Sequence, residues 1–147
     1  MGEPSVDYER LLEMRNAKNR FTKKLGIVVT ALSAGYAKVE KTVEEDDLNP
    51  LGRPHGGLYF TMADNAAGSA MSARGYVAVT MDASYHFFRA ASVGDHLTAE
   101  AREVKGGRTI CVYEVRITDQ SGTLLGMGTF TFFQMEEKLI LFLDKKV

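Results

Sequence analysis

The sequence predicts an α+β fold in which one long helix is wrapped by a curved antiparallel sheet of about six strands. The helix is predicted from residues 57–74, GLYFTMADNAAGSAMSAR, which place small and apolar residues on every side of the helical wheel. A hairpin pattern precedes this segment and four strand-like runs follow it. A long twisted sheet has to bend around the helix to bury it, and the polar residues of the helix exclude a membrane span.

Length and composition indicate a single domain over residues 1–147, because 45% hydrophobic and 25% charged residues are ordinary for a globular protein. The net charge of −1 argues against a dedicated nucleic-acid-binding protein. The single cysteine, Cys111, excludes an intrachain disulfide and is expected to be a packed thiol in a strand. The histidines and the cysteine show no metal-ligand spacing, so no metal site is expected. No signal peptide or membrane anchor is recognised, so we expect a cytoplasmic protein.

Two short helices and a hairpin are predicted ahead of the long helix. Ser5 is the expected N-cap of the first helix, since a serine oxygen can accept a hydrogen bond from a free N–H of the first turn. The predicted elements are helices over 5–15 and around 19–25, within an N-terminal helical segment of residues 1–24, then strands over 27–32 and 36–43 and a loop over 48–54.

Four strands joined by glycine-containing turns are expected after the helix, paired in sequence order as a meander. Alternate residues from Val77 to Phe87 should share one face of the first of these strands. Residues 135–147 are expected to form a C-terminal extension, in which 139–143 are either an edge strand or a tail. The predicted strands cover 77–89, 97–105, 108–118 and 123–134.

The entrance to the long helix has the composition of a site for an anion or an oxyanion. The chain is expected to be extended at Pro54, and Gly56 and Gly57 then let it turn into a helix. The first N–H groups of that helix have no intrahelical acceptor. Such bare donors can stabilise an anion or a developing oxyanion. The alternative is that the two glycines only start a tightly packed helix, which His55 caps.

Asp64 is the candidate catalytic acid, because a carboxylate in the middle of an otherwise uncharged helix is costly to bury unless it is paired or used. Gly56 lies eight residues earlier, which places the two residues roughly 12 Å apart along one helix. One small carbonyl group cannot contact both from the same chain. If the two act together, one of them comes from a second subunit, most simply across a two-fold axis with antiparallel helices.

The chain from Leu25 to Gln134 resembles the hotdog-fold acyl-CoA thioesterases of the PaaI type. The resemblance rests on the order of hairpin, helix and strands, and on Asn49, a His-Gly-Gly triplet and Asp64 around the start of a small-residue helix. It implies a hotdog fold and the hydrolysis of a small or medium acyl- or aryl-acyl-CoA to the free acid and coenzyme A. No cofactor is implied beyond the coenzyme A of the substrate.

The same resemblance implies a role for each residue of the motif. The Gly56 N–H would polarise the thioester carbonyl, with Gly57 also contacting the substrate, and Asp64 of the partner subunit would act as general base or nucleophile. Asn49 would hold the water or the thioester, and His55 would support the turn. A homotetramer, built as a dimer of dimers with intersubunit sites, is also implied.

Some members of this family carry a serine or threonine hydroxyl on the strand after the helix, where this chain has Ala78. Thr80 is the expected substitute, because residues two apart on a strand face the same way. Coenzyme A carries phosphates, so basic side chains should lie around the mouth of the site. Arg89, Lys105 and Arg108 are the candidates, against the alternative that they only make the surface soluble.

Two other functions remain open. An acyl-CoA hydratase or dehydratase on the same fold would pair His55 with Asp64 across a dimer, although the Gly-Gly donors and the Asn49 loop favour hydrolysis. A non-catalytic acyl-CoA sensor would need an appended DNA-binding domain, for which residues 5–15 are too short.

Overall fold

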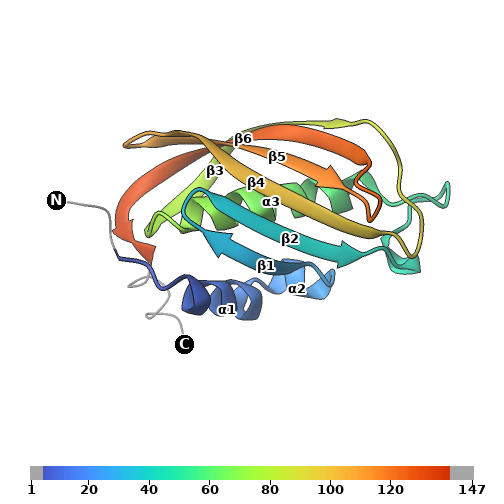
Figure 1. Ribbon diagram of the computed structural model, residues 1–147, viewed down its shortest axis with the longest axis horizontal. Coiled ribbons are helices and arrows are strands. Elements are labelled where there is room, and N and C mark those ends of the chain that lie inside the picture. Colours follow the sequence, from blue (N-terminus) through green and yellow to red (C-terminus); the bar gives the residue numbers. More distant parts are fainter. Residues whose placement is uncertain (1–4, 140–147) are drawn as a thin grey trace.

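One long helix, α3, lies in the concave face of a six-stranded antiparallel sheet in the computed structural model, which describes residues 5–139 (Figure 1). The predicted fold class is therefore confirmed. No helix in this described part of the chain is long and apolar enough to cross a membrane. The elements are α1 (Tyr8–Lys18), α2 (Arg20–Lys24), β1 (Val28–Ser33), β2 (Tyr36–Thr42), the short 3-10 helix η1 (Glu45–Asp47), α3 (Gly56–Ser72), β3 (Tyr76–Phe87), β4 (His96–Gly106), β5 (Ile110–Thr118) and β6 (Leu124–Lys138).

The N-cap of the first helix lies two residues later than predicted. Asp7, rather than Ser5, caps α1, because the Asp7 carboxylate accepts a hydrogen bond from the Arg10 N–H at 3.1 Å. Asn16 then joins α1 to β1: its carboxamide donates to the Val29 carbonyl and accepts from the Val29 N–H, both at 2.9 Å. The N-terminal helices are thereby held against the rest of the fold.

Small side chains on α3 let the sheet approach the helix backbone closely. Alternate residues of β5 face them from the sheet, in the alternation that the sequence predicts. Each large apolar side chain buried in this way contributes about 1.5–3 kcal/mol, so the contact between α3 and the sheet stabilises the fold. The fully buried residues at this contact include Ala63, Ala66, Ala67 and Ala70 of α3 and Cys111, Tyr113, Val115 and Ile117 of β5.

One stripe of α3 is left uncovered within a single chain. Phe60 is 38% exposed, Gly57 is exposed, and Thr61 and Asp64 are half-buried. Residues three, four and seven apart lie on the same side of a helix, so these four form one continuous strip. The expectation of a helix covered on every side is therefore wrong for the isolated chain.

The strand order is β1-β2-β4-β5-β6-β3, so the predicted meander holds only for β4, β5 and β6. β3 pairs with β6 at one edge of the sheet instead of lying beside β4. β6 is long enough to pair with both β5 and β3, and it continues to Lys138. Residues 135–138 of the predicted C-terminal extension therefore belong to the sheet, whereas residues 140–147 lie outside the described residues.

A β-bulge in β3 changes which of its residues share a face. The pairing with β6 shifts between Thr80 and Asp82, so one extra residue is accommodated there. Thr80 lies opposite the buried Phe132 on the side of α3, and Ala83 returns to that side after the bulge. Val79, predicted to share a face with Ala83, is instead 48% exposed. The simple alternation expected along this strand is wrong because of the bulge.

A buried ion pair anchors the segment that leads into α3. The ammonium group of Lys41 lies 3.1 Å from the Asp47 carboxylate, and both side chains are buried. The same ammonium donates to the Leu25 carbonyl at the end of α2. The carbonyl of Asp47 accepts a hydrogen bond from the His55 N–H at 2.8 Å. Lys41 therefore connects β2, α2 and the residue immediately before α3.

We expect Lys41→Met to lower the free energy of unfolding by about 3–5 kcal/mol, because it leaves the buried Asp47 carboxylate without its cation. Chemical denaturation followed by circular dichroism measures the change. The double variant Lys41→Met/Asp47→Leu should lose less, because it removes both charges. Wild-type stability in the single variant would show that the pair does not anchor the loop.

Candidate active site

A histidine cap shapes the start of α3. The backbone of His55 is extended, and its Nδ1 accepts a hydrogen bond from the Gly57 N–H at 2.8 Å. An accepting Nδ1 leaves the imidazole proton on Nε2. The Gly56 N–H is the first of the helix, and it donates to no other residue in the described part of the chain. The cap thus engages the Gly57 N–H and leaves the Gly56 N–H available to a ligand.

The bare Gly56 N–H lies at a surface cavity of about 300 Å³, which Asn49 and Arg89 also line. The Asn49 side-chain oxygen accepts hydrogen bonds from the N–H groups of Leu51 and Arg53, at 2.9 and 3.1 Å. That oxygen therefore stabilises the turn over residues 49–53. The NH₂ group of the same carboxamide is what remains for a ligand in this cavity.

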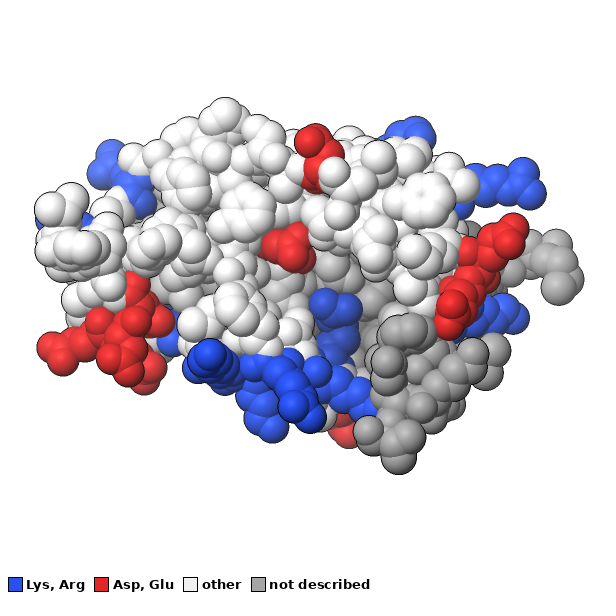
Figure 2. All heavy atoms as spheres, turned by 180° about the vertical axis from the view of Figure 1, so that it is seen from behind, with Lys and Arg blue, Asp and Glu red and all other residues white. Residues whose placement is uncertain are grey.

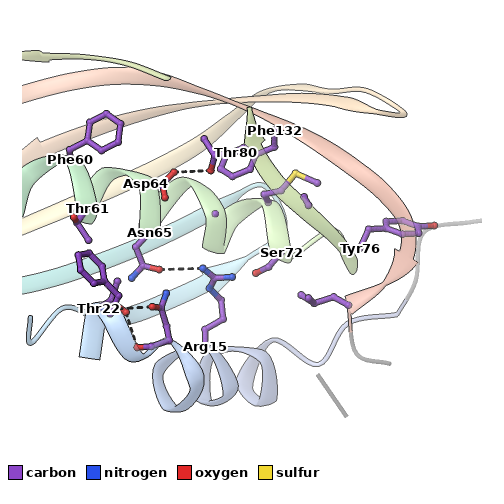
Figure 3. Close-up of a pocket in the computed structure, with 16 residues that line it drawn as sticks. Arg15, Thr22, Phe60, Thr61, Asp64, Asn65, Ser72, Tyr76, Thr80 and Phe132 are labelled. Carbon is purple, nitrogen blue, oxygen red and sulfur yellow. Dashed lines mark hydrogen bonds between the residues drawn. The ribbon is translucent and has the colours of Figure 1, made fainter. Parts of the chain in front are cut away.

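Asp64 lies in a different cavity, of about 330 Å³, whose walls come from α1, α2, α3, β3 and β6. The space-filling view shows a hollow on this face, with lysine and arginine side chains along its lower side (Figure 2). The Thr80 hydroxyl donates to Asp64 Oδ1 at 2.9 Å (Figure 3). Ala78 also lines the cavity, two residues before Thr80 on β3. A half-buried carboxylate, oriented by one hydroxyl, thus faces this space.

An arginine from α1 enters the same cavity. Arg15 extends toward α3, where its Nη2 donates to the Asn65 side-chain oxygen at 3.2 Å (Figure 3). Gly68 lies beside the guanidinium, because a Cβ on this glycine would lie 3.4 Å from Nη2, at ordinary contact distance. Burial lowers the pKa of Arg15 to about 10, and the nearby Asp64 charge partly offsets that effect. The group therefore remains a cation at neutral pH.

Sequence reasoning missed Arg15 and Asn65. Their contact joins residues that lie 50 positions apart in the chain, so no local pattern contains it. One signal was available: Arg15 lies four residues after the buried Leu11, on the same side of α1. That spacing points the arginine toward the interior rather than toward water.

The predicted site residues fall into separate groups within one chain. His55, Gly56, Gly57, Asn49 and Arg89 gather at the N-terminal end of α3, whereas Asp64 and Thr80 line the second cavity.

Lys105 and Arg108 lie at the β4–β5 turn, near the other end of α3. Arg74, two residues beyond α3, donates to the Gly107 carbonyl in that turn at 3.2 Å. The length of α3 therefore separates these two cations from Gly56.

The chemistry available is that of a preorganised N–H donor and of a carboxylate held by a hydroxyl. The donor suits a carbonyl oxygen that gains negative charge, and the carboxylate suits proton abstraction or nucleophilic attack. Among residues 5–139 no three metal-ligating side chains gather into a group that could hold a metal ion.

Comparison with known proteins identifies relatives over most of the chain. Residues 51–125 match the model of the Thioesterase superfamily. The acyl-coenzyme A thioesterase PaaI of Escherichia coli K12 is 36% identical over 98 residues, which cover 67% of this chain and 70% of that protein.

Solved structures share the fold. The E. coli PaaI protein from the phenylacetic acid degradation operon superposes with a TM-score of 0.85 at 27% identity, covering 89% of this chain and 95% of that one. A hypothetical thioesterase from Streptococcus pneumoniae, solved with coenzyme A, gives a TM-score of 0.77 at 29% identity, covering 84% and 98% of the two chains.

We expect Asn65→Leu to lower the free energy of unfolding by about 1–3 kcal/mol, because it removes the buried acceptor of a half-buried guanidinium. Urea denaturation followed by circular dichroism measures the loss. The double variant Arg15→Met/Asn65→Leu should recover part of it, since no buried donor is then left without a partner. Equal stability of Asn65→Leu and the wild type would contradict the importance of this contact.

Proposed function

We propose that this chain, which belongs to the thioesterase superfamily and is an acyl-CoA thioesterase of the PaaI type, has an active site assembled from two subunits. One subunit contributes the Gly56 N–H, and its partner contributes the Asp64 carboxylate. The observation that carries the proposal is that these two groups line separate cavities of one chain. Neither cavity holds both an oxyanion donor and a base.

The proposed reaction begins with the thioester carbonyl oxygen against the Gly56 N–H. The partner's Asp64 takes a proton from water, and the water oxygen bonds to the carbonyl carbon. The carbonyl oxygen then carries the negative charge that the helix N-terminus stabilises. When the carbon–sulfur bond breaks, coenzyme A leaves as the thiolate and the free acid remains.

Two neighbouring contacts support these roles. Thr80 holds Asp64 Oδ1, which leaves Oδ2 to receive the proton from water. The cap made by His55 fixes the first turn of α3, so the Gly56 donor does not need to be reoriented during the reaction. Asn49 is proposed to contact the thioester or the water through its NH₂ group.

A two-fold dimer with antiparallel α3 helices would bring the two cavities together. The open strip on α3 and the unpaired edge of β3 are the surfaces that such a dimer would cover. Exposed apolar side chains on the outer face of the sheet, Val79 and Phe133, would suit the contact between two dimers in a tetramer.

The phosphates of coenzyme A are proposed to bind Arg89, which lines the cavity of Gly56. In an antiparallel dimer, the partner's Lys105 and Arg108 would lie beyond the same end of α3. No further cofactor is proposed, because the reaction needs only water. A reducing cytoplasm is the proposed location, since the one cysteine is a free and buried thiol.

The hydratase alternative is less well supported, because the similar proteins compared above carry the name of thioesterases. Thioester hydrolysis uses the His55 cap as it stands. A hydratase would have to use His55 Nε2 for proton transfer, because Nδ1 is held by the cap.

We predict that Asp64→Asn lowers kcat for acyl-CoA hydrolysis by about 10²–10⁴-fold, because an amide cannot accept the proton from water. Thiol release measured with a chromogenic disulfide gives the rate. Asn can still accept the hydrogen bond from Thr80, so the melting temperature should change little. A folded variant that keeps more than about a tenth of wild-type turnover would remove Asp64 from the mechanism.

Intersubunit sites predict complementation between two inactive variants. Asp64→Asn and Gly56→Pro, unfolded and refolded together, should recover about a quarter of wild-type activity, because half of randomly paired dimers contain one intact site of two. Each variant refolded alone should remain inactive. No recovery despite demonstrated subunit mixing and native circular dichroism would show that the site lies within one chain.

A further inference from the structure

The cavity of Asp64 contains a cation that hydrolysis itself does not use. Arg15 reaches this cavity from α1, and Asp64 reaches it from α3 (Figure 3). An acyl chain attached to a thioester carbonyl beside Asp64 would extend into the same space. The inference below therefore rests on the proposed function and concerns the acyl group that this space accepts.

The guanidinium of Arg15 is incompletely satisfied. It has five N–H donors, and among residues 5–139 the only acceptor of a hydrogen bond from it is the Asn65 side-chain oxygen. Its Nε is shielded from solvent and has no acceptor. Asp64 attracts the charge across space, but within residues 5–139 its carboxylate makes no hydrogen bond or ion pair with the guanidinium. A half-buried cation whose covered Nε has no acceptor, and which faces a cavity, favours an anionic partner there.

We propose that the missing partner is a carboxylate at the far end of the acyl group, so that the enzyme prefers ω-carboxyacyl-CoA to neutral acyl-CoA of the same length. The planar fork of an arginine suits a carboxylate, which can accept two parallel hydrogen bonds from it. Binding requires a modest rotation of the Arg15 side chain, because Nε is covered in the present arrangement.

The spacing along α3 sets the length of such an acyl group. Gly68, which lies against Arg15 Nη2, follows Asp64 by one helical turn, or roughly 6 Å along the axis. A chain of about six carbons in extended form spans that distance. Polar neighbours on the cavity wall, Thr61 and Ser72, are compatible with a charged rather than a purely aliphatic occupant.

Two other roles for Arg15 make different predictions. A purely structural role, joining α1 to α3 through Asn65, would affect all substrates alike. Binding of a coenzyme A phosphate would also affect all acyl-CoA substrates alike. Only recognition of the acyl terminus makes the effect of Arg15 depend on that terminus.

The test compares adipoyl-CoA with hexanoyl-CoA, two chains of equal length that end in a carboxylate and in a methyl group. The wild-type ratio of kcat/KM, adipoyl over hexanoyl, should be at least about 10, because a hydrogen bond to a charged group changes binding by about 10- to 100-fold. Arg15→Met should lower this ratio by a similar factor, whatever its absolute rates. Arg15→Lys should retain part of the preference, because it keeps the charge but not the fork.

Arg20→Met is the matched control. It removes an exposed arginine at the start of α2 that does not line this cavity, and the ratio should not change. If Arg15→Met does not fold, the affinities of folded Asp64→Asn for the two CoA esters, measured by calorimetry, replace the kinetic ratio. In that variant adipoyl-CoA should bind at least about tenfold more tightly than hexanoyl-CoA.

A wild-type ratio near 1, or an equal loss on both substrates in Arg15→Met, would overturn the inference while leaving the thioesterase function intact. Equal affinity of Asp64→Asn for the two esters would do the same. If the wild-type protein hydrolysed neither of these two esters nor any other acyl-CoA, the proposed function itself would be overturned.

Discussion

The buried ion pair between Lys41 and Asp47 is the constraint on which the geometry of the site depends. A cation in this position has to satisfy all of its donors, so it draws the end of α2 and the segment after β2 toward one point. The backbone carbonyl of Asp47 in turn accepts a hydrogen bond from the His55 N–H, which fixes the position of His55. Because His55 caps α3, the direction of the Gly56 donor depends on a buried ion pair that is connected to it only through hydrogen bonds of Asp47 and His55.

The fold class was predictable because the hydrophobic pattern of a segment indicates which of its faces is buried, and this pattern repeats along the whole element. The long helix, the hairpin and the alternation in β5 all follow from that property. The strand order did not follow, because β3 and β4 are adjacent in the chain but lie at different places in the sheet. No local pattern in β3 distinguishes pairing with β6 from pairing with β4.

The candidate site was predictable only where its residues are local in sequence. His55, Gly56 and Asp64 belong to one segment, so helix geometry alone separates the donor from the acid. Arg15 and Asn65 meet only after α1 has folded back over α3, and their role therefore needed the structure. Sequence reasoning identified the chemistry of hydrolysis, whereas the character of the surrounding cavity depends on contacts between distant elements.

The bulge in β3 shifts the alternation of inward and outward side chains by one residue between the two parts of the strand. If the same residues formed a regular strand with no bulge, a strand that keeps Ala83 and Tyr85 against the helix would turn Thr80 outward, because residues three apart face opposite sides. The position of the hydroxyl beside Asp64 therefore depends on the bulged backbone conformation between Thr80 and Asp82. Straightening the bulge without changing any residue would leave Thr80 and Asp64 in the sequence and still separate their side chains in space.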